Sequence, residues 1–499
     1  MAGTWDLVIR NATIYDGTGA KPFSGSLAVN GDRIGAVGDV SGEGMQELDA
    51  TGQAIAPGFI DVHSHDDFAV FLTPAMDFKV MQGVTTDVVG NCGMGASPFP
   101  IAVAMFSGLH GRSNVPEWKG YGGYLDEIDH NPASLNVGVL VGHGTVRFSA
   151  MGKACREPSG RELDQMRSLV SEGLEAGALG MSTGLIYEPG RWAQTAELVE
   201  LARVAHRTGG LYASHMRDEE THLLDSVSET IRIGEEAGVP VQISHHKAAG
   251  RENWGKVRES LKLIEEARGR GVDVTADQYP YTSGSTVLQA VIQNGGLDEV
   301  KPPGGTMSFI PPDKVLFAST PKHPQWEGRT LRDFCDEWKM KPRDAGDKIA
   351  AEEGPGTVVV IQTMNEDDVR TVMRHPSTMI GSDGLAMGSR PHPRLYGTFP
   401  RVLAHYVRDG GLMPLEEGIH RMTGMPAAKF HLKDRGLLRQ GFFADLVIFD
   451  PARLKDTATY DQPRRYPEGL SHVFVNGVAV VRQGLHTGAR PGKALRRDA

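Results

Sequence analysis

The stretch Phe59-Ile60-Asp61-Val62-His63-Ser64-His65 joins a short apolar strand to two histidines. Side chains two residues apart on a strand point to the same face, so the imidazoles of His63 and His65 can reach one ion. In barrels of alternating strands and helices, the residues just past the carboxyl ends of the strands carry the chemistry. The stretch therefore predicts the first strand of such a barrel and part of a metal site.

Seven further apolar segments follow, each bounded by glycine or proline. The eight candidate strands are residues 59–63, 85–90, 136–141, 178–182, 211–215, 239–244, 272–277 and 378–382. Amphipathic helices lie between several of them, and Leu163, Met166 and Val170 share one helical face. Apolar strands that alternate with helices indicate a parallel sheet buried on both faces. We expect an α/β fold with a (β/α)8 TIM-like barrel, and an open doubly wound sheet is the alternative.

Both ends of the chain contain short β-rich segments with turns. Asn30-Gly31 and Asn476-Gly477 are hairpin signals within them. We therefore expect a small β-sandwich domain formed by both termini, from residues 1–57 and 430–499. The barrel would then occupy residues 58–429.

One interval breaks the alternation of strands and helices. Residues 284–356 are rich in proline and glycine but also carry Trp326 and Trp338, which can pack in a core. We expect an inserted lobe here, before strand eight and near the active-site end. The basic residues close to the C-terminus are expected to form a solvated tail: Arg490, Lys493, Arg496 and Arg497.

The composition excludes several classes of protein. A net charge of −10, without a concentrated basic track, argues against a nucleic-acid partner. The start of the chain lacks the pattern of a signal peptide, and no run of 18 apolar residues predicts a membrane span. Three cysteines cannot make a disulfide framework and fit a reducing compartment. We expect a cytoplasmic protein without a membrane partner, and its oligomeric state is left open.

Side chains that can bind metal gather at five of the expected strand ends. They are His63, His65, Cys92, His215, His245 and Asp383. A single buried histidine or cysteine is more often a packing residue, but packing does not predict such residues at five strand ends. Imidazole and thiolate ligands favour zinc, and the cation would stabilise the thiolate form of the cysteine. The sequence therefore predicts a zinc site.

Several motifs in these positions resemble those of a known family. Residues 56–65 (APGFIDVHSH) and 436–447 (GLL…G…ADLV) resemble signatures of the amidohydrolase superfamily. Within it the chain is similar, essentially end to end, to the N-acyl-D-amino-acid deacylases, or D-aminoacylases. The motifs that carry this likeness are GNCG (90–93), GHGTVR (142–147), STGLIY (182–187), SHMRDE (214–219), SHHK (244–247), GSDG (381–384) and PHPRLYGTF (391–399).

The resemblance implies two metal positions. Cys92, His215 and His245 would form a tight zinc site. His63 and His65 would form a second site that is weakly occupied. Many members of the superfamily bridge two metals with a carboxylated lysine from strand four, but strand four of this chain reads ALGMS and has no lysine. The cysteine after strand two takes that place, which is the deacylase pattern.

The family implies zinc-dependent hydrolysis of N-acyl-D-amino acids, which gives a D-amino acid and a carboxylic acid. A metal-activated water would attack the amide carbonyl, with Asp383 as general base and then as general acid. Arg394 and Lys247 offer the charges that the substrate α-carboxylate needs. Four further residues are candidates for substrate binding. Tyr187 and Tyr279 would donate hydroxyl hydrogen bonds, His143 would hydrogen-bond the reacting carbonyl, and Ile186 would contact the side chain of the substrate.

Three other readings stay open at this point. A cyclic-amide hydrolase of the dihydroorotase or hydantoinase kind is disfavoured because strand four lacks the lysine. A deaminase would use an acid after strand five, such as Asp218 or Glu219, but would leave Arg394 and Lys247 unexplained. A non-catalytic scaffold would be expected to have lost ligands. The preferred side chain of the substrate is undecided, although Ile186 and the lack of Arg or Lys in residues 283–288 point toward apolar groups.

Overall fold

A computed structural model describes residues 4–110 and 115–497, and eight parallel strands form its centre. All eight expected strands are present, and each pairs with the next along the chain. They are β6 (Phe59–Asp61), β7 (Val84–Val89), β8 (Asn136–Gly142), β9 (Gly180–Gly184), β10 (Leu211–His215), β11 (Val241–Ile243), β12 (Val274–Gln278) and β16 (Thr378–Ile380).

The first and last of these strands meet just beyond their carboxyl ends. The Asp383 amide donates to the His63 carbonyl at 2.7 Å, and the His65 amide donates to the Gly384 carbonyl at 3.2 Å. A parallel bridge joins Ser64 to Gly384. These bonds nearly close the sheet into a barrel, so the expected TIM-like fold is confirmed and the open sheet is excluded.

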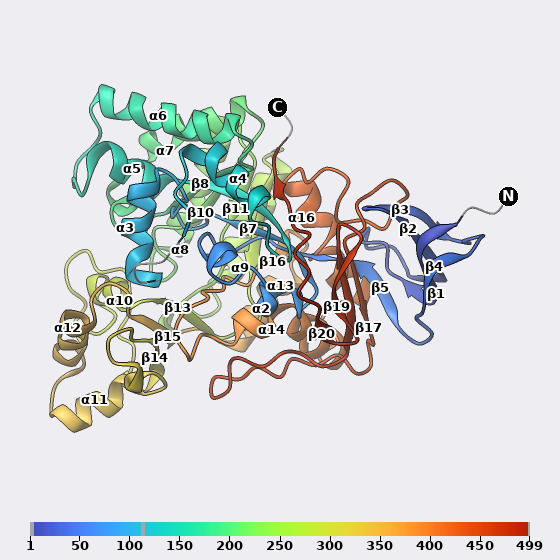
Figure 1. The fold of residues 1–499 in the computed structure, drawn as a ribbon. Helices are drawn as coiled ribbons and strands as arrows, with labels where there is room; N and C mark the ends of the chain where they lie inside the picture. Colours follow the sequence, from blue (N-terminus) through green and yellow to red (C-terminus); the bar gives the residue numbers. More distant parts are fainter. Residues whose placement is uncertain (1–3, 111–114, 498–499) are drawn as a thin grey trace.

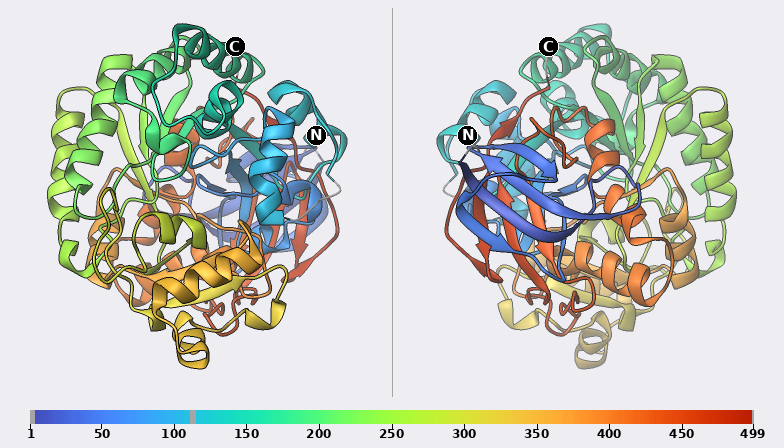
Figure 2. Two further views of the ribbon diagram at one scale, coloured as in Figure 1. Left: turned by 90° about the vertical axis from the view of Figure 1, so that its left-hand side faces the viewer. Right: turned by 90° about the vertical axis from the view of Figure 1, so that its right-hand side faces the viewer.

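Helices that follow the strands surround the barrel (Figures 1 and 2). Those of eight residues or more are α3 (Phe99–His110), α4 (Gly120–His130), α5 (His143–Met151), α6 (Gly160–Glu175), α7 (Thr195–Arg207), α8 (Leu223–Ala237), α9 (Val257–Gly269), α13 (Glu366–Arg374), α14 (Arg394–Arg401) and η5 (Val402–Asp409). The shorter ones are α1 (Ala69–Leu72), α2 (Asp77–Val80), α15 (Leu415–His420) and α16 (Gly424–Lys429). Within the described ranges, no helix is long and apolar enough to cross a bilayer.

The helix α6 shows how local sequence and burial agree. Ser159 and Glu162 form a capping box in which the side chain of each residue accepts the backbone amide of the other. Met166, Val170 and Leu174 lie on one face and are buried against the barrel core. This is the amphipathic face that the apolar spacing predicts.

Both ends of the chain build one nine-stranded sheet beside the barrel. Its strands are β1 (Trp5–Ile14), β2 (Phe23–Asn30), β3 (Arg33–Gly38), β4 (Gly44–Asp49), β5 (Ala54–Pro57), β17 (Leu446–Phe449), β18 (Leu470–Val475), β19 (Val478–Arg482) and β20 (Leu485–His486). Antiparallel pairing of β5 with β17 joins the two contributions. Ile9 and Leu27 from one half share an apolar cluster with Ile448 and Phe474 from the other. The exact boundaries of this domain stay a prediction.

The C-terminal tail returns to the barrel. The short strand β21 (Ala494–Leu495) pairs in parallel with β8. Arg496 bonds to Asp126 and Asp129 of α4 at 2.8 and 2.6 Å. The tail is therefore docked on the barrel rather than free, although Arg490, Lys493 and Arg496 remain exposed to solvent as expected.

The segment between β12 and β16 has its own antiparallel sheet and core. The sheet contains β13 (Ser283–Val287), β14 (Val315–Ser319) and β15 (Val358–Gln362), and the helices are α10 (Leu288–Gln293), α11 (Leu331–Trp338) and α12 (Pro342–Glu353). Phe317 and Phe334 lie in its core, with Trp326 and Trp338 packed against them. We call this segment the lobe. It lies at the opposite end of the molecule from β1–β4 (Figure 1), and its expected limits, residues 284–356, stay a prediction.

Candidate metal-dependent active site

Six side chains bring possible ligand atoms together at the carboxyl ends of the strands. The atoms form three overlapping triplets, each within 4.8 Å: His63, His65 and Cys92; Cys92, His215 and His245; His63, His245 and Asp383. All six residues are buried. They follow or end β6, β7, β10, β11 and β16, so the sequence expectation that these strand ends converge is met in the structure.

Ring nitrogens and sulfur face one another in the Cys92 triplet. His245 Nε2 lies 2.9 Å from His215 Nδ1 and 3.5 Å from Cys92 Sγ. One thiol and two imidazoles are the donor set that zinc accepts in three-ligand sites. These three residues therefore fit a zinc-type cation.

A second group of donors lies beside the first. His65 Nε2 is 3.1 Å from Asp383 Oδ1, and His63 Nε2 is 3.6 Å from the same oxygen. His63 Nε2 is also 3.3 Å from Cys92 Sγ, so the cysteine touches both groups. The arrangement can hold a second cation next to the first, with the thiol between them.

The backbone is unusual at three of the six positions. Cys92, His245 and Asp383 have φ angles of 54°, 37° and 49°. This left-handed region is sparsely populated by residues other than glycine, and occupying it costs about 1–3 kcal/mol for each residue. Such strain clusters at functional sites, where the rest of the fold outweighs the local preference.

Neighbouring imidazoles favour the thiolate form of Cys92. Burial raises the pKa of this thiol, but the opposing effect of His63, His215 and His245 is larger. The net pKa therefore lies well below its ordinary value. A thiolate is the form that binds metal. The electrostatics of the site therefore agree with the chemistry of its donors.

Two carboxylates that the sequence did not identify as supports hold the imidazoles of His63 and His245 in place. Asp277 Oδ1 lies 3.1 Å from His63 Nδ1 and accepts the His245 amide at 2.8 Å. Glu219 Oε1 lies 2.9 Å from His245 Nδ1. A carboxylate on the far nitrogen fixes the tautomer and orientation of a metal-binding histidine. Asp277 could have been found from the sequence, because it follows strand seven in the same way that the ligand-type residues follow theirs.

A buried lysine lies beneath the ligand-type residues. Lys79 Nζ is 2.5 Å from Asp61 Oδ2, 3.1 Å from Asp66 Oδ2 and 3.6 Å from Asp87 Oδ1, and all four side chains are fully buried. Asp61 Oδ1 in turn accepts the amides of His63 at 3.2 Å and Ser382 at 2.8 Å. Lys79 thus neutralises an acid that ties together the backbones of β6 and β16.

Lys79→Met is expected to lower the free energy of unfolding by about 3–5 kcal/mol, because it leaves the acidic cluster buried without its cation. Urea denaturation followed by circular dichroism measures the change. Lys262→Met is the matched control, since Lys262 is mostly exposed and should change stability by no more than about 0.5 kcal/mol. Equal urea midpoints for the two variants would contradict the role of Lys79.

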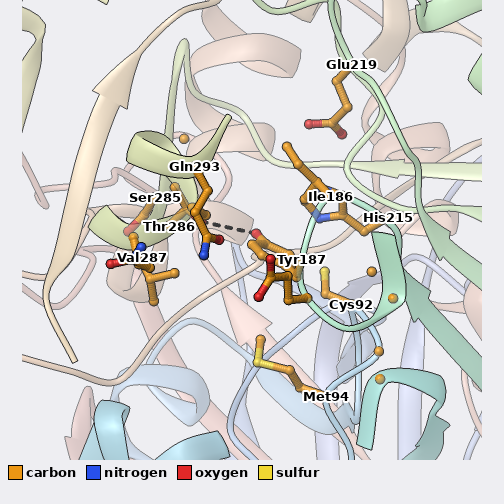
Figure 3. A pocket seen from close by; sticks show the side chains of 18 of the residues that line it. Cys92, Met94, Ile186, Tyr187, His215, Glu219, Ser285, Thr286, Val287 and Gln293 are labelled. Atoms are coloured by element: carbon orange, nitrogen blue, oxygen red, sulfur yellow. Dashed lines mark hydrogen bonds between the residues drawn. The ribbon is translucent and has the colours of Figure 1, made fainter. Parts of the chain in front are cut away.

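A cavity of about 560 Å³ opens over the ligand-type atoms. Figure 3 shows Cys92 and His215 on one side of it and Thr286, Val287 and Gln293 of the lobe on the other. The lobe therefore forms the wall that faces the ligand-type residues. A small molecule held in this cavity would lie between the ligand-type residues and the lobe.

Four of the six expected substrate-binding residues line this cavity. They are Ile186, Tyr187, Lys247 and Tyr279, and Asp383 lines it with them. The Tyr187 hydroxyl is 3.1 Å from Thr286 Oγ1, so it links the barrel to the lobe across the cavity. Lys247 Nζ lies 2.6 Å from Glu219 Oε1. Tyr281, two residues further along the chain than Tyr279, does not line the cavity.

Arg394 and His143 lie behind the cavity wall. Arg394 Nη1 is 2.9 Å from Asp383 Oδ2, and its guanidinium lies 4.6 Å from the ring centroid of Tyr279. His143 Nε2 is 2.8 Å from Glu197 Oε1, while its buried Nδ1 has no hydrogen-bond partner. Contacts of these two residues with a substrate stay predictions.

The Asp383 carboxyl is held in its ionised form. Burial raises the pKa of this group, but the opposing effect of Arg394 and His65 is larger. The net pKa therefore lies well below its ordinary value. An ionised carboxylate can accept a proton. Asp383 therefore has the charge state that a general base needs.

Fold and site together define a class of metal-dependent barrel enzymes with nitrogen and sulfur donors at the strand ends. The chain belongs to the amidohydrolase family, whose model matches residues 46–291 and 346–481. It is 40% identical to a D-aminoacylase of Alcaligenes xylosoxydans xylosoxydans, over 99% of this chain and 98% of that protein. It is 38% identical to an N-acyl-D-glutamate deacylase of the same organism, over 99% and 97% of the two chains.

A solved structure shows the same fold. The N-acyl-D-glutamate deacylase of Bordetella bronchiseptica, complexed with zinc and a phosphonate mimic of the tetrahedral intermediate, aligns with a TM-score of 0.89. The two are 37% identical, and the alignment covers 99% of this chain and 100% of that one. The expected family is thereby confirmed.

Proposed function

We propose that this protein is a zinc-dependent hydrolase that cleaves the amide bond of N-acyl-D-amino acids and releases a D-amino acid and a carboxylic acid. The observation that carries the proposal is the grouping of Cys92, His215 and His245 beside an ionised Asp383 on one cavity wall. The names of the D-aminoacylase and deacylase relatives support the substrate class.

Cys92, His215 and His245 would hold zinc tightly, and His63 with His65 would hold a second ion more weakly. A bound zinc ion polarises an amide carbonyl and lowers the pKa of water to about 7. Asp277 and Glu219 orient the imidazoles of His63 and His245, respectively, through the ring nitrogens that face away from the metal site. The reduced thiol of Cys92 suits a reducing compartment, so we also propose a cytoplasmic location.

Asp383 accepts a proton from the attacking water and returns it to the leaving nitrogen. Lys247 and Arg394 bind the α-carboxylate, with Tyr187 and Tyr279 as hydroxyl donors. His143 hydrogen-bonds the reacting carbonyl. Because the carbonyl and the carboxylate are both fixed, inversion at the α-carbon would drive the side chain into a wall.

A direct assay tests this function. Zinc-loaded protein is incubated with matched N-acetyl-D- and N-acetyl-L-amino acids and with hydantoin, and the products are quantified. Release of free amine from the D series alone supports the proposal. Ring opening of hydantoin without amine release would favour a cyclic-amide hydrolase instead, and no product from any acylated amino acid would overturn the proposal.

Glu219→Gln is expected to lower zinc affinity by about 10–100-fold, because the charged partner of His245 Nδ1 is lost. Competition with a chromophoric chelator measures the dissociation constant. Glu188→Gln is the matched control, since Glu188 lines the same cavity but is exposed and not one of the carboxylates that orient the histidines. Equal affinities in both variants and the unaltered protein would show that Glu219 does not support the metal.

A further inference from the structure

Overall identity does not decide which side chain the substrate carries. The D-aminoacylase and N-acyl-D-glutamate deacylase relatives are 40% and 38% identical to this chain, which is too close to distinguish them. The groups that line the cavity carry more information. Their charges determine which substrate side chains can be buried there.

The cavity holds more acids than bases. Among its described lining residues, the lysines are Lys153 and Lys247, and none is an arginine. The lining acids are Glu188, Glu219, Glu220 and Asp383. Lys247 is already 2.6 Å from Glu219, and Lys153 is exposed to solvent. Once Lys247 and Arg394 bind the α-carboxylate of the substrate, this lining offers no further buried lysine or arginine to a side-chain carboxylate.

The wall opposite Cys92 and His215 is uncharged. It is formed by residues 285–287 of β13 (Figure 3) and by Gln289 and Gln293 of α10. The two glutamines are four residues apart and so lie one turn apart on the same helix face. The remaining lining is largely apolar and includes Met94, Met105, Phe148, Ile186, Met307 and Leu385. Flexible methionine side chains adapt to apolar groups of different shape.

We propose that the enzyme acts on D-amino acids with uncharged, mainly apolar side chains and discriminates against acidic ones. The inference rests on the proposed deacylase function. A side-chain carboxylate would lose water, gain no buried cation and approach like charges, and each effect disfavours its binding. A neutral side chain of the same size meets none of these penalties.

The test compares kcat/KM for N-acetyl-D-glutamine and N-acetyl-D-glutamate, which are nearly equal in size and differ in charge, with N-acetyl-D-methionine as the apolar reference. We expect the glutamine and methionine derivatives to exceed the glutamate derivative by about tenfold or more. A glutamate derivative that equals or exceeds the glutamine derivative would overturn the inference and leave the deacylase function intact. Product from none of the three would overturn the function itself, and the inference with it.

A charge placed on the lobe wall tests the cause. Gln293 is exposed and lines the cavity, so substitutions there should not disturb the core. Gln293→Lys is expected to raise the ratio of kcat/KM for the glutamate over the glutamine derivative by about tenfold. Gln293→Met, a neutral side chain of similar length, should leave that ratio unchanged. The same ratio in both variants would refute the role of wall charge.

Discussion

Asp383→Asn is expected to lower kcat by about 10²–10⁴-fold while the protein keeps its zinc. Asparagine has nearly the same shape as aspartate and is among the residues that tolerate the φ of 49° found at this position. It cannot accept a proton as a carboxylate does. The change therefore removes the proposed general base without removing any of the three donors of the Cys92 triplet.

Two measurements on Asp383→Asn separate catalysis from metal binding. Steady-state kinetics with an N-acetyl-D-amino acid gives kcat, and elemental analysis gives zinc per chain. Zinc content should match that of the unaltered protein. An unchanged kcat would remove Asp383 from the mechanism, and loss of zinc together with activity would make it a ligand of the tight site instead.

Cys92→Ala is expected to weaken zinc binding by more than about 100-fold, since removal of a ligand should cost at least as much as loss of a supporting carboxylate. The thiol lies 3.3 Å from His63 Nε2 and 3.5 Å from His245 Nε2, so the variant loses the donor that both groups share. Activity without added metal should disappear with it. The imidazoles of His215 and His245 then hold the cation without the thiolate.

Cys155→Ala is the matched control for this experiment, because Cys155 is an exposed cysteine outside the cavity. Elemental analysis after dialysis and titration with a competing chelator give the zinc content and affinity of both variants. Zinc retained equally by both would refute the assignment of Cys92 as a ligand.

The sequence predicted the barrel because its strands carry their own signals. Segments such as 137–141 are apolar throughout and are bounded by turn residues, which is typical of strands buried on both faces. The ligand-type residues could also be predicted, because they lie at the ends of these strands. His63 and His215 stand at strand ends, and parallel strands bring their carboxyl ends to one edge of the barrel.

Features that depend on pairing across the fold could not be predicted in the same way. Lys79 lies in a short helix and becomes a buried counter-ion only because β6 and β7 place Asp61 and Asp87 around it. Arg394 lies 2.9 Å from Asp383, a contact between distant segments that no local motif shows, and its expected contact with the substrate stays a prediction. Local spacing does not encode such side-chain directions, which arise from packing between distant segments.

The left-handed backbone at three donor positions limits how the site can be redesigned. Exchange of Cys92 for histidine would offer zinc another good ligand, and histidine tolerates a φ of 54°, as His245 at 37° does here, whereas a β-branched residue would be strained. Aspartate suits that conformation and replaces a soft donor with a hard one, which shifts preference toward metals such as manganese. The backbone conformation at position 92 therefore restricts which metal-binding residues can evolve there, in addition to the chemistry of their donor atoms.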